Sequence, residues 1–189
     1  MIIGILAFQG DFKLHENILN KLNIKTKLIK YKKQLEEIDA LIIPGGESTV
    51  MSKMLIENNF DLSIKKFSKK HSIYGTCAGA ILMSSKCNDV NVKNMSIVDI
   101  EVKRNAWGRQ IDSFSDKVEL SFSKECKFDA TFIRAPKFKI KNGDVEVLSK
   151  YKEEPVLIRN KKHLVSSFHP EIKEDLRIHK YFIGMISEK

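Results

Sequence analysis

A cysteine lies between two glycines in Gly75-Thr76-Cys77-Ala78-Gly79, part of the stretch YGTCAGAIL. This is the form of a nucleophile elbow, in which the glycines relieve crowding at a sharp turn between a strand and a helix. The turn lifts the nucleophile above the carboxyl ends of the strands, where open α/β sheets bind ligands. A cysteine that only fills a core needs no glycine on either side, so the pattern predicts that Cys77 attacks a substrate.

The thiol needs help to react, because the thiolate is the nucleophile. A cysteine with the ordinary pKa of about 8.5 is only about 3% thiolate at pH 7. Lowering that pKa to about 6 requires roughly 3.4 kcal/mol of preferential thiolate stabilisation. A helix N-terminus typically supplies ~0.3–1 kcal/mol and at most about 2. We therefore expect a protonatable base beside the sulfur.

The chain offers five histidines as that base: His15, His71, His163, His169 and His179. His169 is the best placed, because it follows an apolar run in SSFHPEI and precedes Pro170, which favours extended backbone. Residues two apart in an extended chain point the same way, so His169 and Glu171 can project together. The carboxylate would hold one imidazole nitrogen while the other faces the thiol, as in a catalytic triad. The sequence leaves the role of His15 open.

Acyl transfer also requires donors that stabilise an oxyanion. The backbone N–H of Ala78 is one candidate. The second is expected from PGGES, where Gly45 and Gly46 free the backbone to aim an amide at the same edge of the sheet. The alternative reading of PGGES is a simple turn.

The elements that must position these residues alternate between strand and helix in the first half of the chain. Strands are expected at residues 2–8, 24–31, 38–46 and 72–76, helices at 11–22 and 48–59, and a further helix opens at Cys77. Asp11 is the expected N-cap of the first helix, and Ser48 or Thr49 begins the second. This alternation predicts an α/β fold with a mostly parallel sheet wrapped by helices.

The second half of the chain is richer in short β-type runs. Strands are expected at residues 96–102, 117–122, 130–135, 145–151, 155–160 and 163–168, and an amphipathic helix at 174–186. We expect antiparallel strands there to extend one side of the central sheet.

Composition restricts the class of protein. The chain of 189 residues, 42% hydrophobic and 30% charged, suits one globular domain over residues 1–189. Its three cysteines, Cys77, Cys87 and Cys126, form no C-x-x-C pair, which favours a reducing, cytoplasmic setting without disulfides or a zinc ribbon. No apolar run reaches the ~18–20 residues of a membrane span. The net charge of +9 comes from scattered lysines, without the basic stripe and aromatic platforms typical of nucleic-acid binding.

The same stretches resemble a known family. The order of cysteine, histidine and glutamate, with a His-x-Glu pair, is similar to the class I glutamine amidotransferases. Within that class the chain resembles the PdxT/SNO family, the glutaminase subunits of pyridoxal 5′-phosphate synthase. The matching stretches span nearly the whole chain: GILAFQGDFKLH, ALIIPGGESTVM, GTCAGAIL, RNAWGRQIDSF, FIRAP and VSSFHPE.

The resemblance implies a three-layer, flavodoxin-like fold and the hydrolysis of L-glutamine to L-glutamate and ammonia. Cys77 would form a thioester, His169 would transfer the protons, Glu171 would orient His169, and Gln9 would help to shape the oxyanion region or the partner contact. The glutamine contacts implied by the family are Gly46, Glu47, Ser48, Arg104, Ile133 and Arg134. A zwitterionic substrate suits such a set, because its amine needs an anion and its carboxylate needs cations.

The resemblance also implies a partner. The ammonia would pass to a (β/α)₈ synthase subunit that builds pyridoxal 5′-phosphate, and docking would complete the oxyanion hole. No cofactor or metal of its own, no nucleic acid and no membrane are expected for this chain. The alternatives are an amidotransferase that feeds a different synthase, a DJ-1-like redox or chaperone protein with an oxidisable elbow cysteine, and a basic RNA-binding module.

Overall fold

The computed structural model describes all residues except 108–112, 126, 142–143 and 188–189. The central part of the RNAWGRQIDSF stretch and Cys126 lie outside the described residues. The helices are α1 Phe12–Lys21, α2 Ser48–Glu57, α3 Phe60–Ser68, α4 Ala78–Met83 and α5 Arg177–Ser187, with a 3₁₀ helix, η1, at Lys32–Glu37. The strands of the first half are β1 Ile2–Leu6, β2 Lys25–Ile29, β3 Ala40–Ile43, β4 Ser72–Thr76 and β5 Ser84–Cys87. Those of the second half are β6 Val98–Lys103, β7 Ser113–Val118, β8 Phe128–Ile133, β9 Lys137–Ile140, β10 Glu146–Tyr151, β11 Glu154–Arg159 and β12 His163–Ser166.

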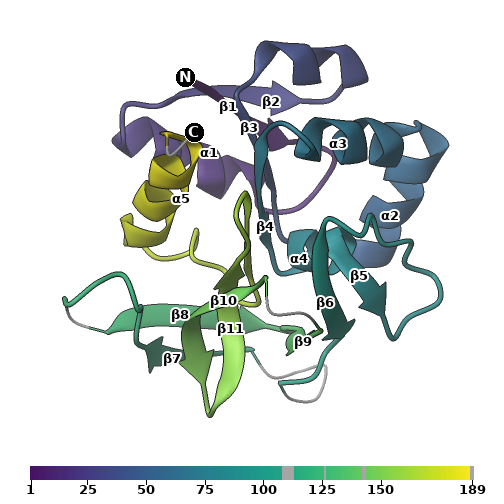
Figure 1. The fold of residues 1–189 in the computed structure, drawn as a ribbon. Helices are drawn as coiled ribbons and strands as arrows, with labels where there is room; N and C mark the ends of the chain where they lie inside the picture. The colour runs from purple at the N-terminus through teal and green to yellow at the C-terminus, as the bar shows by residue number, and fades with distance from the viewer. Residues whose placement is uncertain (108–112, 126, 142–143, 188–189) are drawn as a thin grey trace.

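A seven-stranded sheet in the order β10-β11-β12-β4-β3-β1-β2 forms the centre of the fold. The strands from β12 to β2 pair in parallel, whereas β10 and β11 pair antiparallel and extend one side, as the sequence predicts. Helices α1 and α5 cover one face of this sheet, and α2, α3 and α4 cover the other (Figure 1). The α/β class with a mostly parallel sheet and added antiparallel strands is confirmed.

The strands form this sheet because both of its faces are buried. In β3 all four residues are buried, and they alternate between two cores. Leu41 and Ile43 pack with α2, α3 and α4, whereas Ala40 and Ile42 pack with α1 and α5. Near-continuous apolar runs are typical of parallel strands with helices on both sides.

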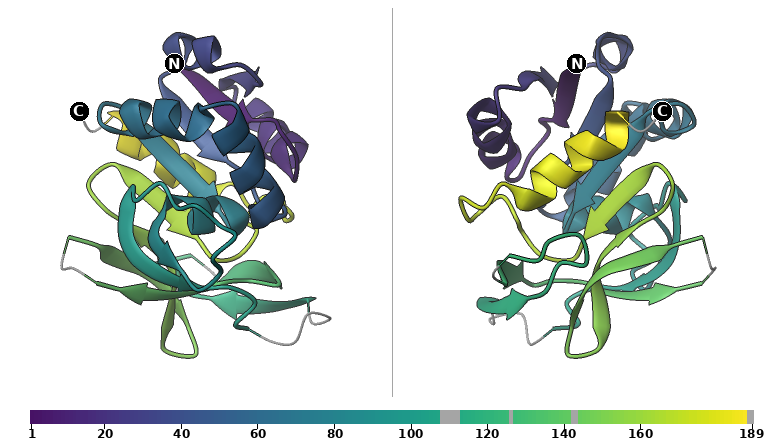
Figure 2. Two further views of the ribbon diagram at one scale, coloured as in Figure 1. Left: turned by 90° about the vertical axis from the view of Figure 1, so that its right-hand side faces the viewer. Right: turned by 60° about the vertical axis from the view of Figure 1, so that its left-hand side comes forward.

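Two small sheets complete the structure. Strands β5, β6 and β9 form one, and β7 pairs antiparallel with β8 in the other (Figure 2). The strand expected at residues 117–122 was placed wrongly, because the paired segment is Ser113–Val118, which has little apolar character of its own. Strands β5 and β9, helix α3 and η1 were not predicted.

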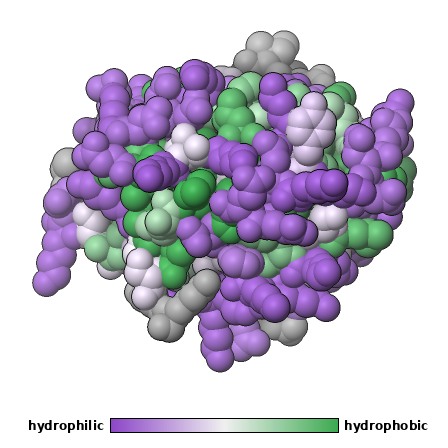
Figure 3. All heavy atoms as spheres, turned by 90° about the horizontal axis from the view of Figure 1, so that it is seen from above, coloured by the Kyte–Doolittle hydropathy of each residue, from purple (hydrophilic) through white to green (hydrophobic). Residues whose placement is uncertain are grey.

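Figure 3 shows the molecule from above relative to the view of Figure 1. This surface is mostly hydrophilic, with a smaller hydrophobic area among the polar side chains. Among the residues that the structure describes, no helix has both the length and the apolar character needed to cross a membrane.

Candidate active site

The carboxyl ends of four neighbouring parallel strands meet at one edge of the central sheet. Residues 9–11 follow β1, residues 45–48 follow β3, Cys77 follows β4, and residues 169–171 follow β12. Strands β1, β3, β4 and β12 are consecutive in the sheet, so these loops lie side by side. The edge therefore collects the predicted nucleophile, base, carboxylate and glycine turn.

Cys77 occupies the turn between β4 and α4 in a conformation that side chains rarely adopt. Its backbone angles are φ 45° and ψ −101°. The Cys77 N–H donates to the Ser166 carbonyl at 2.9 Å, and the Cys77 carbonyl accepts from Ile81 N–H at 3.1 Å. Such backbone strain costs on the order of 1–3 kcal/mol and persists where the surroundings fix it, as here between a strand and a helix.

The two flanking glycines are required by close packing. A Cβ atom on Gly79 would lie 2.0 Å from the Ile43 carbonyl oxygen, and one on Gly75 would lie 2.6 Å from Met83 Sδ. Both distances are far below van der Waals contact. The glycines let α4 pack against the strands at the elbow, which explains the pattern from which the nucleophile was predicted.

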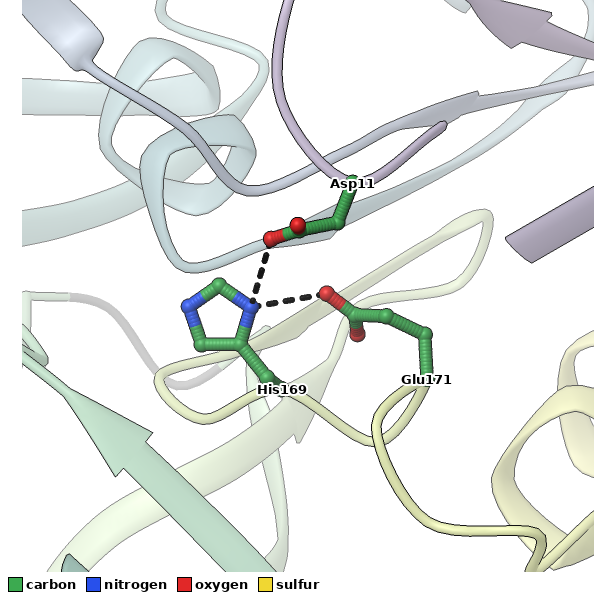
Figure 4. Close-up of side chains that lie close together, drawn as sticks. All are labelled: Asp11, His169 and Glu171. Carbon is green, nitrogen blue, oxygen red and sulfur yellow. Dashed lines mark hydrogen bonds and ion pairs between the residues drawn. The ribbon is translucent and has the colours of Figure 1, made fainter. Parts of the chain in front are cut away.

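The imidazole of His169 lies between two carboxylates (Figure 4). Its Nδ1 is 2.7 Å from Glu171 Oε1 and 3.4 Å from Asp11 Oδ2. The other ring nitrogen points away from both carboxylates in Figure 4, and His169 lines the same cleft as Cys77. Glu171 therefore fixes the Nδ1–H form of the neutral ring, which leaves Nε2 as the proton acceptor.

The charges around His169 favour its protonated form. Burial by itself lowers the pKa of the imidazole, but Asp11, Cys77 and Glu171 together raise it, and the net pKa lies well above the ordinary value. The arrangement thus stabilises an imidazolium in the cleft that Cys77 also lines. His169 is therefore the candidate for the protonatable base that the sequence predicts, because a helix N-terminus alone is insufficient.

Asp11 was predicted as the N-cap of the first helix, and it occupies that position in α1. Its side chain makes no capping hydrogen bond and instead faces His169. The signal was available in the sequence, because Asp11 follows β1 at the same edge as Gln9 and Gly10. Helix α2 begins at Ser48 as expected, while its cap is Glu47, which accepts from Val50 N–H at 3.0 Å.

The predicted glutamine contacts line one cleft of about 270 Å³ that contains Cys77 and His169. They are Gly46, Glu47, Ser48, Arg104, Ile133 and Arg134, and Asp11, Ile81 and Asn105 complete the lining. Arg104 comes from the loop after β6, and its Nη2 lies 3.0 Å from Glu47 Oε1. The Arg104 guanidinium also pairs with Asp89, a residue that sequence reasoning missed because only tertiary structure brings its loop to the cleft.

Gly46, one of the predicted oxyanion donors, lines the same cleft. Ala78 is the first residue of α4, directly after the nucleophile. The Gly45 carbonyl accepts a hydrogen bond from Asp11 N–H at 3.2 Å, and the trans peptide points the Gly46 N–H in the opposite direction. Gln9 Nε2 donates to the Glu47 carbonyl at 3.0 Å, which fixes the loop after β3.

The remaining histidines separate into two groups. His71 and His163 stand at the amino ends of β4 and β12, at the opposite edge of the sheet. His15 and His179 are completely buried, and His15 Nε2 lies 3.5 Å from Glu171 Oε2. Sequence reasoning assigned no function to this pair.

Among the described residues, one group of donor atoms is close enough together to hold a metal ion. It consists of Asp11, His169 and Glu171, whose donor atoms lie within 4.8 Å of one another. Nδ1 of His169 is already bonded to Glu171 in this group, and the expectation of a metal-free site stays a prediction.

Comparison with known proteins assigns the architecture to a class. The crystal structure of a glutamine amidotransferase superposes with a TM-score of 0.92 and 38% identity, covering 99% of this chain and all of that one. A glutamine amidotransferase from Thermotoga maritima shares the fold, with a TM-score of 0.62 and 14% identity, covering all of this chain and 85% of that one. The three-layer glutamine amidotransferase fold implied by the sequence motifs is confirmed.

The comparison of sequences narrows the class to one family. Residues 5–188 match the SNO glutamine amidotransferase family. A relative named pyridoxal 5′-phosphate synthase subunit PdxT, from Thermosipho africanus, is 42% identical over the full length of both chains. A protein of the same name from Francisella philomiragia is 42% identical over 97% of this chain and 98% of its own. The chain belongs to the SNO glutamine amidotransferase family.

Proposed function

We propose that this chain, acting as one domain over residues 1–189, hydrolyses L-glutamine to L-glutamate and ammonia. The observation that carries the proposal is a strained cysteine in one cleft with a histidine whose Nδ1 lies 2.7 Å from a buried glutamate, in a chain of this family. Each of the three residues lies at the carboxyl end of its strand, where α/β folds place their chemistry.

The proposed reaction has two stages. The Cys77 thiolate attacks the side-chain amide carbon of glutamine, and the His169 imidazolium gives its proton to the nitrogen that leaves as ammonia. Water, deprotonated by His169 Nε2, then attacks the thioester, releases glutamate and returns the thiol. Glu171 orients the imidazole and stabilises its charge in both stages.

Backbone amides would stabilise the oxyanion in each stage. We assign this role to Ala78 and to the turn at Gly45 and Gly46. Removing one such donor from a hydrolase costs roughly 2.7–4 kcal/mol of activation free energy, so the geometry of this turn decides whether the site is active.

Substrate selection is assigned to the lining of the cleft. Glu47 offers a carboxylate for the α-amine of glutamine, and Arg104 and Arg134 offer cations for its α-carboxylate. Gly46, Ser48 and Ile133 would complete the contacts around the side chain. The ion pair between Glu47 and Arg104 holds both groups in place at the cleft.

The relatives' name indicates a subunit of pyridoxal 5′-phosphate synthase. We propose that this chain supplies ammonia to a synthase partner with a (β/α)₈ fold, and that docking of this partner completes the oxyanion hole. Because the nucleophile must stay reduced, we place the protein in the cytoplasm. A redox role is disfavoured, since an oxidisable cysteine does not require the His169–Glu171 pair.

Ammonia release from glutamine tests the proposal, measured for the wild type and Cys77→Ala with and without the synthase partner. We expect turnover only for the wild type with its partner. Equal turnover by Cys77→Ala would overturn the mechanism, and full activity of the isolated wild type would overturn only the dependence on docking.

A further inference from the structure

A chain of buried polar groups continues behind the proposed triad. Glu171 Oε1 accepts from His169, but the second oxygen, Oε2, is buried and has no hydrogen-bond partner within normal distance. His15 Nε2 lies 3.5 Å from this oxygen. A buried carboxylate oxygen without a donor is costly, so the position of His15 matters to Glu171.

His15 is itself held from two further elements. It comes from α1, and its Nδ1 lies 2.9 Å from Nε2 of His179 on α5. Its Nε2 also lies 3.3 Å from the hydroxyl of Thr76, the residue before the nucleophile. Both imidazoles are completely buried, so neither can exchange these partners for solvent.

Only one assignment of protons gives every buried N–H of the two rings a partner. If His15 carries its proton on Nε2, it donates towards Glu171 and Thr76, and its Nδ1 accepts from His179 Nε2–H. The one ring nitrogen without a partner is then His179 Nδ1, which carries no proton in this assignment. This agrees with the structure, in which His179 Nδ1 is buried and has no hydrogen-bond partner. The opposite assignment would aim a lone pair of His15 at the carboxylate and leave a buried N–H on His179 without an acceptor.

The two rings are neutral at pH 7. Burial, His179 and His169 lower the pKa of His15 well below its ordinary value, and burial lowers that of His179 to about 3. His15 thus gives the carboxylate a donor without adding a second positive charge. Among the described residues, the Tyr74 ring packs against both imidazoles, and its hydroxyl is bonded to Ser166 Oγ at 3.1 Å. Asp11 and Cys77 act on the neighbouring His169.

We propose that His15 is a positioning residue of the triad, whose Nε2–H holds the second oxygen of Glu171, and that His179 fixes the tautomer that makes this possible. The proposal rests on the proposed glutaminase reaction. The distance of 3.5 Å belongs to the protein without substrate, and hydrogen bonds in active sites commonly shorten when the reacting complex forms.

Two substitutions of His15 separate positioning from packing. His15→Leu removes the donor and keeps an apolar volume, whereas the amide nitrogen of His15→Gln can occupy the place of Nε2. In the complex with the synthase partner, we expect His15→Leu to lower kcat on the order of 10- to 100-fold with KM unchanged. We also expect the alkaline limb of the kcat/KM profile to move to lower pH, because a less restrained Glu171 supports the His169 imidazolium less well. His15→Gln should recover most of both effects.

His163 provides the matched control. It is also a buried histidine, with burial lowering its pKa to about 4, but it stands at the opposite end of β12 and accepts from the Ile73 N–H. His163→Leu should lower the melting temperature without moving kcat or the pH limb. Wild-type kcat and pH profile in His15→Leu would overturn the proposal, and so would equal losses in His15→Leu and His15→Gln with no change of the pH limb.

Histidine NMR of the isolated chain tests the same contact without turnover. We expect the Nε2–H tautomer for His15 in the wild type. In a Glu171→Gln variant the carboxylate that faces this N–H is gone, so the His15 Nε2–H signal should change. An Nδ1–H tautomer of His15 would overturn the positioning role even if the complex is active. Absence of glutamine hydrolysis by the wild-type complex would instead count against the proposed function and leave the NMR result to decide the role of His15.

Discussion

Replacing Gly45 by alanine should displace the proposed catalytic base while changing a residue that has no functional group. Gly45 lies at the turn after β3, directly against the imidazole of His169. A Cβ atom built there would be 2.3 Å from His169 Cε1, 2.9 Å from Nδ1 and 3.3 Å from Nε2. The obstacle is a ring whose Nδ1 is held by Glu171, so the ring cannot rotate away freely.

The size of the effect follows from this geometry. Ordinary contact between carbon atoms begins at about 3.5 Å, so the ring or the loop must move by roughly 1 Å. A misplacement of about 1 Å in a catalytic group costs on the order of 100-fold in rate, which corresponds to about 2.7 kcal/mol of activation free energy. Overpacking a buried site costs in addition ~1–3 kcal/mol of stability. We therefore expect Gly45→Ala to lower kcat about 100-fold and to remain folded.

The assay is glutamine hydrolysis in the presence of the synthase partner, with thermal unfolding measured in parallel. Gly184→Ala is the control, because a Cβ atom at Gly184 in α5 would meet nothing within 4 Å. Alanine there should leave kcat unchanged and stabilise the helix by up to ~1 kcal/mol. Gly45→Ala with a kcat within threefold of the wild type would show that His169 does not need the position observed here.

Three further predictions concern charge. Glu171→Gln should lower kcat by on the order of 10²-fold or more and move the alkaline limb of the pH–rate profile to lower pH, because the His169 imidazolium loses a carboxylate that raises its pKa; an unmoved limb refutes this. Arg104→Ala should raise KM about 10- to 100-fold, the cost of a lost charged hydrogen bond of ~1.5–3 kcal/mol, and an unchanged KM refutes the assigned carboxylate contact. Burial lowers the pKa of His163 to about 4 and that of His179 to about 3. Below about pH 6.5 the unfolded chain therefore binds more protons than the folded chain, and the free energy of unfolding decreases as the pH is lowered. Each of these two groups should cost about 2 kcal/mol between pH 7 and pH 5 in urea unfolding, and a flat stability over that range would contradict their burial as neutral rings.

Much of the fold follows from local patterns in the chain. The parallel strands β1, β3 and β4 are short apolar runs, and their predicted positions agree with the structure to within a few residues. The elbow at Cys77 is a local feature too, because the two glycines and the strand before it specify the turn. In contrast, β7 and β9 have mixed polar sequences, and they are strands only because a partner strand pairs with them.

The candidate site divides in the same way. The residue types and spacing of Cys77, His169 and Glu171 were enough to predict a triad, because a His-x-Glu pair in extended chain projects both side chains together. The position of Asp11 after β1 indicates the right edge of the sheet, but local spacing does not pair it with His169. Asp89 could not be paired with Arg104, because the two residues follow different strands, β5 and β6.

The sequence by itself determined the class of chemistry, because its signals are local patterns: a glycine-flanked cysteine, a His-x-Glu pair and the stretches around them. Only the tertiary structure decided how the charges are arranged around the imidazole and what lies behind the glutamate. His15 and His179 are 164 residues apart, yet His15 Nδ1 lies 2.9 Å from His179 Nε2 because α1 and α5 cover the same face of the sheet. Burial between these helices keeps both rings neutral, a property of the packed interior that no local pattern encodes.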